Sequence, residues 1–539
     1  MRWMPPKQNA AARPAETDVT VSGEAAMAEA ANGKGASTLR SVFSNWAGLV
    51  INGVVSLVLT PILVHGLGDL YFGMFTLVAS LLDSYWLLDF GMRTTIFRFV
   101  ARYQGGGRRR ELNETFASGL AIALLSASAI LLLTMGAFAV LPRFFAVAGG
   151  DRMIFRWLLA LSGAALAAAF TAQFLGTYLC AFRRFDLYNL LSVMTGLVRA
   201  GLIVLAFRLH MGIRAVALAT LVASASGLLA SVRAVWIADP ALAVSMKNVY
   251  RERIRELLSF SSHAFLGTLG DQLRFFVDSV VIGRVLSIAL ITPFAIPLRL
   301  MTLFRQLGVA LASPMAGVMS EMEGRKVPEE SREYFLFATR MCALLSLFIG
   351  LLLLVNGQAI IRVWVGPAYL GSYRLLVILL AGQCLMLAQQ PSVDLLIAKG
   401  KHRFRGWWTL AEGLANLFLS IYWARKYGLV GIAWGTTVPM LVVQLLVQPW
   451  YTLHTAALNV MRYLRHALAR PVLISVLYLG VCWLAKPWLH TANVWQLLLT
   501  VGWQSLLFGA LTWVLGLTAY ERRRLIEKAR GLANPNEDC

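Results

Sequence analysis

Charged residues are scarce in this sequence: Asp, Glu, Lys and Arg together make up 14% of its 539 residues. Soluble domains carry about 25% charged residues and about 45–50% apolar residues. Here hydrophobic residues reach 58% and the mean hydropathy is +0.66. Water cannot solvate that much apolar side chain, so the composition excludes an ordinary soluble protein and indicates a membrane protein.

Cysteine is scarce as well, with five residues in the whole chain. Four of them lie inside apolar stretches and Cys539 is the last residue, so the spacing matches neither a metal site nor a disulfide framework. We therefore expect no metal site and no cofactor.

The apolar core of a signal peptide is missing from the N-terminal segment, where residues 1–36 are rich in Ala, Gly, Glu and Pro. We expect residues 1–41 to form a disordered cytoplasmic extension. The first hydrophobic helix then serves as the uncleaved insertion signal.

Long apolar runs are abundant. A helix needs roughly 20 apolar residues to cross a bilayer, and the sequence contains fourteen such runs. They lie at 42–65, 72–93, 116–142, 154–182, 189–207, 214–238, 259–287, 291–318, 336–358, 374–398, 407–426, 430–452, 471–489 and 496–520. The sequence thus predicts an all-α polytopic membrane protein of about fourteen transmembrane helices.

Basic residues predict the orientation of these helices. If the N-terminus is cytoplasmic, the cytoplasmic segments carry 31 Lys and Arg and the opposite loops carry four. That asymmetry follows the positive-inside rule, so we expect both termini in the cytoplasm of a bacterial inner membrane. The net charge of +22 is explained by topology and by contact with anionic membrane lipids, and nucleic acid is not needed as a partner.

An internal repeat predicts how the helices are grouped. Residues 179–207 and 396–424 both pass from a helix end through a basic turn into a new helix, at an offset of about 216 residues. The aligned pairs are Gly196 with Gly413, Gly212 with Gly428, Ala217 with Ala433 and Thr220 with Thr436.

The same offset carries residue 42 close to the start of the seventh run, so we expect two lobes of six helices each. The predicted parts are an N-lobe (42–238), a cytoplasmic basic amphipathic linker (239–258), a C-lobe (259–452), two appended helices (471–520) and a cytoplasmic tail (521–539). In repeat transporters of this kind the substrate site lies between the lobes near the bilayer midplane.

Ionisable residues inside the apolar runs are candidate site residues, because charge at bilayer depth requires a partner or a wet cavity. The seventh run carries His263, Gly267, Asp271, Arg274 and Asp278 on one helical face, which predicts a polar stripe. Pairing within that helix, at Asp271–Arg274 or Arg274–Asp278, is the alternative.

We divide the candidate residues by the chemistry of their side chains. Arginines favour an anionic substrate, because guanidinium pairs bidentately with phosphate; carboxylates are candidates for a coupling proton or cation. The predicted cationic lumen comprises Arg199, Arg274, Arg284, Arg299 and Arg305; the ion-coupling candidates are Asp83, Asp89, Asp271, Asp278 and Glu412; the polar lumen residues are Asn45, Asn52 and Gln306. A local ion pair of Asp89 with Arg93 is a strong alternative for Asp89.

Short motifs in the chain resemble a known family. They are the LG…YFG turn (Leu67, Gly68, Tyr71, Gly73), the LDFGM segment that follows it, and VWVGPAYLGSY at 363–373. Together they resemble the Wzx-type polysaccharide flippases of the MATE-like MOP superfamily. The resemblance implies a V-shaped bundle of two six-helix lobes plus two C-terminal helices. It also implies alternating access for a polyprenyl-pyrophosphate-linked oligosaccharide, with coupling to an ion gradient.

The expected function is therefore that of a flippase for an O-antigen, capsule or exopolysaccharide repeat unit, with no enzymatic activity. Expected partners are the lipid-linked oligosaccharide, a coupling proton or sodium ion, membrane lipids, a glycan polymerase and a chain-length regulator. The alternatives are a MATE-type drug or cation antiporter, a peptidoglycan-precursor flippase, and a membrane glycan polymerase or ligase. An arginine-rich lumen argues against a cation exporter, and the short outer loops argue against a polymerase or ligase.

Overall fold

The computed structural model describes residues 20–89, 91–255, 257, 269–274, 276–325, 327–401, 403–485, 493–518, 521–523 and 526. All the regular secondary-structure elements among these residues are helices, which confirms the predicted all-α class. His263 and Gly267 of the predicted polar stripe, residues 1–19 of the N-terminal segment and most of the 521–539 tail lie outside the described residues.

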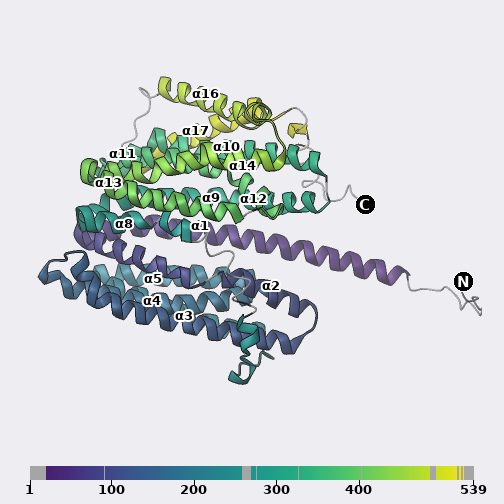
Figure 1. The fold of residues 1–539 in the computed structure, drawn as a ribbon, viewed down its shortest axis with the longest axis horizontal. Helices are drawn as coiled ribbons and strands as arrows, with labels where there is room; N and C mark the ends of the chain where they lie inside the picture. Colours follow the sequence, from purple (N-terminus) through teal and green to yellow (C-terminus); the bar gives the residue numbers. More distant parts are fainter. Residues whose placement is uncertain are drawn as a thin grey trace, which may run out of the picture.

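One group of helices comes from the N-terminal half of the chain (Figure 1). It contains α1 (Thr20–Asp83), α2 (Met92–Gly105), α3 (Arg109–Phe144), α4 (Arg152–Ala181), α5 (Phe185–Arg208) and α6 (Gly212–Ala238), with a short 3-10 turn at Ser84–Asp89. Small residues let α4 lie close to α3: a Cβ added at Gly163 would approach the Thr134 side chain to 2.5 Å.

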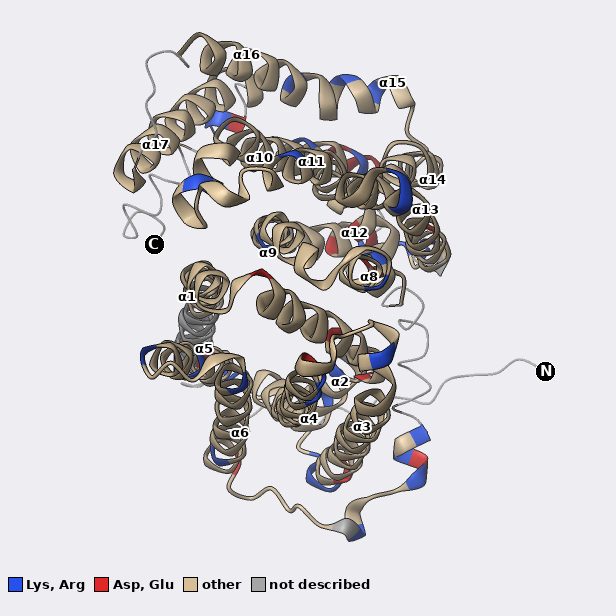
Figure 2. Cartoon of the chain, turned by 90° about the vertical axis from the view of Figure 1, so that its left-hand side faces the viewer, with Lys and Arg blue, Asp and Glu red and all other residues tan. Residues whose placement is uncertain are grey.

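A second group follows, and Figure 2 shows it beside the first group, with α8 and α9 on the side of α1. It contains α8 (Val277–Val281), α9 (Ile291–Gly324), α10 (Pro328–Trp364), α11 (Ser372–Ala388), α12 (Gln390–Ala398), α13 (Arg403–Val442) and α14 (Gln448–Ala456). The last helices, α15 (Val460–Tyr463), α16 (Ala469–Ala485) and α17 (Val494–Leu511), pack on the outer side of α10. Short π-helical turns at Ile282–Leu286, Val443–Val447, Leu464–Leu468 and Thr512–Gly516 and 3-10 turns at Ile288–Leu290 and Pro367–Tyr369 connect them.

Eleven helical segments among the described residues are long and apolar enough to cross a membrane. Two of them, Ser44–Asp89 and Phe404–Ala456, each contain two predicted runs. Glycines interrupt both: Gly68 has φ 72° and Gly428 has φ 59°, outside the helical region. Residues 259–268 and 275 of the predicted run 259–287 lie outside the described residues, and the structure is compatible with fourteen spans.

Two glycines aligned by the repeat have the same backbone geometry. Gly212 has φ 68° and Gly428 has φ 59°, and each precedes the last long helix of its group. A left-handed residue of this kind favours glycine, because a Cβ would be strained there. The match supports the two-lobe division, and we keep the names N-lobe for residues 42–238 and C-lobe for residues 259–452.

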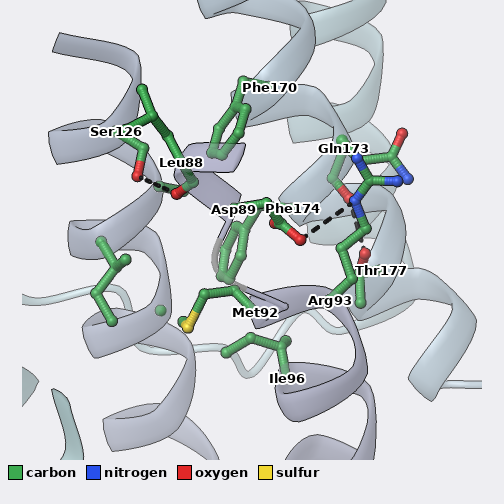
Figure 3. Close-up of a pocket in the computed structure, with 13 residues that line it drawn as sticks. Leu88, Asp89, Met92, Arg93, Ile96, Ser126, Phe170, Gln173, Phe174 and Thr177 are labelled. Atoms are coloured by element: carbon green, nitrogen blue, oxygen red, sulfur yellow. Dashed lines mark hydrogen bonds and ion pairs between the residues drawn. The ribbon is translucent and has the colours of Figure 1, made fainter. Parts of the chain in front are cut away.

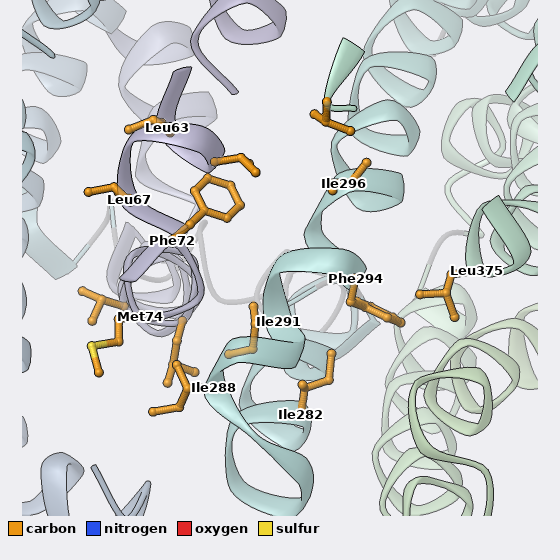
Figure 4. Packing of buried hydrophobic residues seen from close by; sticks show 14 of the residues in the cluster. Leu63, Leu67, Phe72, Met74, Ile282, Ile288, Ile291, Phe294, Ile296 and Leu375 are labelled. Atoms are coloured by element: carbon orange, nitrogen blue, oxygen red, sulfur yellow. The ribbon is translucent and has the colours of Figure 1, made fainter. Parts of the chain in front are cut away.

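The largest apolar cluster joins the two lobes. Figure 4 shows the segment of α1 that carries Leu67, Phe72 and Met74 beside Ile288 and Ile291, which lie before and at the start of α9, and all five belong to one buried cluster. All five side chains are at most 9% exposed. Burial of this kind contributes about 25 cal/mol per Å² of apolar surface, so the seam holds the lobes together at this end of the bundle.

The N-terminal segment differs in structure from the expectation. Helix α1 begins at Thr20, so residues 20–41 are helical where a disordered extension is predicted. The alanine-rich sequence there explains the difference, since alanine has the highest helix propensity.

The linker that follows α6 packs on the N-lobe. Asp239 accepts a hydrogen bond from the Tyr178 hydroxyl at 2.7 Å and one from Arg109 at 2.6 Å, and Arg253 pairs with Glu114 at 3.5 Å. These contacts fix the linker to α3 and α4.

Candidate functional site

Two of the three family-like motifs, the LG…YFG turn and residues 363–373, meet at the end of the bundle where the lobes join. The Tyr369 hydroxyl donates to Asp69 Oδ1 at 2.6 Å, and the Thr292 hydroxyl donates to the Asp69 carbonyl at 2.7 Å. Burial and the hydrogen bond to Asp69 raise the pKa of Tyr369, so the hydroxyl keeps its proton at neutral pH. We call this end the closed end. By the distribution of basic residues it is predicted to face the periplasm.

Close backbone packing seals the same end. A Cβ added at Gly73 would lie 2.2 Å from the Ile288 carbonyl oxygen, which no side chain permits. The indole N–H of Trp364 donates to the Leu57 carbonyl at 2.7 Å, and the Tyr71 hydroxyl donates to Asp151 at 3.1 Å. These two sequence motifs are therefore structural elements of the closed end.

A cluster of three charged residues lies between the lobes, away from the closed end. Arg299 of α9 interacts electrostatically with Asp83 of α1, which attracts it, and with Arg199 of α5, which repels it. The Arg299 side chain is solvent-exposed although it lies within a membrane-spanning helix, and the Nε of Arg199 is buried with no hydrogen-bond partner among the described residues. We call Asp83, Arg199 and Arg299 the lumen cluster. It carries two positive charges and one negative charge.

Arg274, which we predicted to belong to the cationic lumen, is buried in an ion pair. It is 4% exposed and pairs with Glu412 of α13, which is 2% exposed. It also pairs with Asp271 at 3.5 Å, which confirms one of the two local pairs that the spacing favours. Arg305 of α9 interacts electrostatically with the same Asp271. With its charge balanced inside the C-lobe, Arg274 positions Glu412 and Asp271.

Oxygen atoms gather around Asp278 in the core of the C-lobe. Asp278 Oδ2 accepts a hydrogen bond from the Thr436 hydroxyl at 2.8 Å, and its Oδ1 is buried with no hydrogen-bond partner among the described residues. The Ser420 hydroxyl donates to Asn416 Oδ1 at 2.8 Å, and the Thr436 hydroxyl lies 3.2 Å from that same oxygen. We call Asp278, Asn416, Ser420 and Thr436 the oxygen cluster; each residue is at most 7% exposed.

This arrangement suits a monovalent cation or a proton. One carboxylate with several neutral oxygens supplies the hard ligands that sodium requires, whereas a divalent ion would need more negative charge. No group of three or more His, Cys, Asp or Glu side chains among the described residues could hold a metal ion.

Two glycines bring the seventh span against α13 beside the oxygen cluster. A Cβ at Gly270 would lie 2.7 Å from the Thr409 carbonyl carbon, and a Cβ at Gly413 would lie 2.7 Å from Leu273 Cβ. The repeat partner of Gly413 has the same role in the N-lobe, where a Cβ at Gly196 would lie 2.9 Å from Asn52 Oδ1. In both lobes a small residue permits a close crossing of polar helices.

Asp89 forms the local ion pair that its spacing favours. Its carboxylate lies 3.7 Å from Arg93, whose guanidinium also stacks over Trp86 at 4.6 Å. Figure 3 shows this pair at the edge of a pocket enclosed by Leu88, Met92, Phe170 and Phe174. The pocket holds about 20 Å³, room for about one water molecule, so it cannot hold a large substrate.

The remaining predicted residues lie apart from the lumen cluster. Arg284 is exposed near the closed end, with its guanidinium 5.2 Å from the ring centre of Phe144. Asn45 accepts a hydrogen bond from Asn189 at 2.5 Å and Asn52 donates to Ser192 at 3.3 Å, so both join α1 to α5.

Gln306 lies at an apolar groove between the lobes. The groove has a volume of about 380 Å³ and runs between the first half of α1, α9 and α10. Apart from Gln306, its lining consists of aliphatic residues, Phe304 and Gly53.

Sequence reasoning missed three members of the oxygen cluster. Asn416 and Ser420 follow Glu412 at successive i,i+4 positions, so a polar stripe along α13 is visible in the sequence. Thr436 is one of the residues aligned by the repeat. Uncharged polar side chains cost less at bilayer depth than charged ones, so the stripe does not by itself indicate a site.

Comparison with known proteins places the fold. Residues 38–290 match the family described as "Polysaccharide biosynthesis protein". No curated protein sequence matches the chain.

Solved structures of transporters share the architecture at low sequence identity. An inward-facing multidrug resistance MATE family transporter of the MOP superfamily has a TM-score of 0.68 and 15% identity, over 75% of this chain and 94% of its own. The lipid II flippase MurJ in an inward closed conformation has a TM-score of 0.66 and 14% identity, over 88% of this chain and 98% of its own. A MOP superfamily transporter from Pyrococcus furiosus, described as having a binding pocket of reverse polarity, has a TM-score of 0.59 and 16% identity, over 77% of this chain and 95% of its own.

Proposed function

We propose that this chain, a MATE-like membrane protein of the MOP superfamily that resembles the polysaccharide flippases, translocates a polyprenyl-pyrophosphate-linked oligosaccharide by alternating access. The family match and the structural neighbours are with transporters and flippases, in agreement with the expectation that the chain is not an enzyme. The cargo is an O-antigen, capsule or exopolysaccharide repeat unit, which crosses the inner membrane from the cytoplasmic to the periplasmic leaflet.

The lumen cluster is the observation that carries the proposal. Arg299 interacts with one carboxylate, Asp83, and with a second arginine, Arg199, so the cluster keeps a net positive charge at bilayer depth. Uncompensated charge there is expensive, and an anionic ligand offsets it. Guanidinium groups bind phosphate oxygens through charge-assisted hydrogen bonds, so a pyrophosphate head group fits between the lobes.

The apolar groove supports a lipid-linked cargo. It opens between α1, α9 and α10, and Val50 and Val54 on its α1 side are 50% and 53% exposed. Apart from Gln306, the lining is as apolar as the polyprenyl chain and the bilayer interior, so such a groove accepts the chain beside the lumen. The sugar and pyrophosphate stay in the polar space between the lobes.

Contacts at the closed end support alternating access. They join the lobes at the end predicted to face the periplasm, so the lumen cluster is reached from the cytoplasmic end in this state. Translocation then requires that the contacts of Asp69 with Tyr369 and Thr292 break while the opposite end closes.

The oxygen cluster is the candidate for ion coupling. Occupation of Asp278 by sodium or by a proton changes the charge in the core of the C-lobe, beside the Arg274–Glu412 pair. Asp278 and Arg274 lie on the seventh span, and Asn416 and Glu412 lie on the first half of α13. A change at Asp278 therefore biases the packing of these two helices and hence the equilibrium between states.

A drug or cation antiporter is the second candidate, because MATE transporters share the fold. The net positive lumen cluster disfavours a cationic substrate. A peptidoglycan-precursor flippase is close in chemistry, since the neighbour MurJ is described as a lipid II flippase. A glycan polymerase and a chain-length regulator are expected to act on the translocated product.

Transport of two cargoes of opposite charge distinguishes the candidates. Purified full-length protein is placed in proteoliposomes with a fluorescent undecaprenyl-pyrophosphate oligosaccharide, and leaflet exchange is followed with a membrane-impermeant quencher under imposed sodium or proton gradients. We expect exchange of the pyrophosphate lipid and no transport of ethidium. Ethidium transport without lipid exchange would establish the antiporter instead.

A further inference from the structure

A second basic cavity lies away from the lumen, where α10 meets the start of α16 and Thr518, which follows α17. It has a volume of about 400 Å³ and is lined by Arg340, Arg465, His466, Arg470 and Thr518. None of these residues belongs to the lumen cluster or to the oxygen cluster. We call it the basic cavity.

Positive charge exceeds negative charge in this cavity. Arg340 is 7% exposed and pairs with Glu521, and it is repelled electrostatically by Arg470. Three guanidinium groups therefore share one carboxylate at this place. Like charges held together in a partly buried site raise its affinity for an anion.

Hydrogen-bond donors in the cavity lack acceptors. The Nε of Arg340 and the Nη1 of Arg470 are buried with no hydrogen-bond partner among the described residues. Leaving a buried charged donor unsatisfied costs more than leaving a neutral one, so both nitrogens favour an acceptor that enters the cavity.

Glu521 is held in place by two groups. It accepts a hydrogen bond from the backbone N–H of Thr518 at 2.7 Å, and its own N–H donates to the Thr518 hydroxyl at 3.2 Å. This reciprocal pair is a capping box, which fixes the carboxylate at a helix start. Glu521 thus stays with Arg340, and the charge of Arg465 and Arg470 is left for a ligand.

The surface beside the cavity is apolar. Val472 is 54% exposed, Leu473 is 51% exposed and Leu464 is 43% exposed, all on the helical segment that carries Arg465 and Arg470. The phosphate of a lipid can accept hydrogen bonds from the arginines in the cavity while its acyl chains cover these apolar side chains. Free phosphate would leave the apolar side chains uncovered, so the arrangement favours a lipid.

We propose that the basic cavity formed by Arg340, Arg465, His466 and Arg470 binds the phosphate of an anionic phospholipid at the membrane surface. The site is separate from the translocation path, and its occupation does not depend on the proposed flippase activity. A bound lipid joins α10, α16 and the end of α17, so it fastens the appended helices to the C-lobe.

Thermal unfolding of the full-length protein in mixed micelles tests the site. Phosphatidylglycerol is titrated in one series, phosphatidylcholine in a second and inorganic phosphate in a third. We expect phosphatidylglycerol to raise Tm and the other two to leave it unchanged. In Arg465→Gln/Arg470→Gln the phosphatidylglycerol concentration needed for half of the shift increases about tenfold, since two charge-assisted contacts are lost.

The matched control removes two positive charges elsewhere. Arg425 and Lys426 are exposed next to the break at Gly428, and Arg425→Gln/Lys426→Gln keeps the wild-type response. If the double variant in the cavity is unstable, Arg465→Gln alone serves, because Arg465 is exposed. An unchanged response of the cavity variants to phosphatidylglycerol, or none in the wild type, overturns the proposal. An equal shift with inorganic phosphate overturns the lipid assignment.

Discussion

Charges within the membrane divide by whether a partner balances them. Arg274 has Glu412 and Asp271, and Asp89 has Arg93, so these groups serve structure. Among the described residues, Arg299 has Asp83 as its only opposite charge and Arg199 as a like charge, so the cluster keeps an excess positive charge. At the scale of single residues, it is this excess that separates a ligand site from an ion pair.

Removal of the Asp278 carboxylate tests the coupling role of the oxygen cluster. If sodium binds there, sodium at ten times its Kd stabilises the wild-type protein by about 1.4 kcal/mol, and Asp278→Asn abolishes the effect because the single negative ligand is gone. The measurement is Tm against sodium concentration at constant ionic strength, with potassium as the reference salt. A sodium-induced shift that survives in Asp278→Asn would locate the ion elsewhere, and a shift absent from the wild type would favour the proton.

The sequence identifies the charged residues and leaves their partners open. The spacing of Asp271 and Arg274 predicts their pairing, because i,i+3 neighbours lie on one face of a helix. The stronger partner of Arg274, Glu412, lies 138 residues away, and no local pattern reports such a contact. For the same reason Arg284 could not be separated from Arg299 by residue type alone.

At the scale of the element, glycines decide where helices approach or turn. Gly68 and Gly428 interrupt two long helices at the closed end, and Gly73 permits contact with the Ile288 carbonyl. Apolar run lengths predict most spans well, since hydropathy depends on local composition. The junctions within α1 and α13 depend on single glycines, and the α1 junction also depends on contacts of Asp69 with Tyr369 and Thr292 of the other lobe.

Overpacking of the closed end tests its role as a gate. Gly73→Val places a side chain against the Ile288 carbonyl, and overpacking of this kind costs about 1–3 kcal/mol. Because the strain exists only while the lobes are joined there, the equilibrium shifts toward the state open at that end. The measurement uses Leu63→Cys, in the buried seam, with the five native cysteines replaced and a membrane-impermeant maleimide as the probe.

We expect Gly73→Val to raise the labelling rate at position 63 by about tenfold or more, in proportion to the population shift. Gly136→Val is the control, since a Cβ there meets no atom within 4 Å. Equal labelling of the two variants would show that the closed end is not strained by Gly73→Val and that its contacts do not gate access.

At the scale of the whole molecule, two lobes meet at one end, and the lumen cluster lies between them. The composition predicts a membrane protein, because apolar side chains must lie in the bilayer. The repeat predicts two similar lobes, because similar sequences adopt similar folds. The side on which the lobes join is a property of the state, which the sequence does not specify. The combination of a closed end, a cationic centre and an apolar groove is what favours an anionic, lipid-linked cargo.

Leaflet exchange by two arginine variants tests this account most directly. Arg299→Gln removes half of the arginine pair in the lumen cluster, whereas Arg284→Gln removes an equal charge near the closed end. In proteoliposomes with fluorescent undecaprenyl-pyrophosphate oligosaccharide, we expect Arg299→Gln to slow exchange by about tenfold or more, the equivalent of at least about 1.4 kcal/mol. Arg284→Gln should retain most of the wild-type rate. Wild-type exchange by Arg299→Gln, or equal losses in the two variants, would contradict the assignment of the pyrophosphate to the lumen cluster.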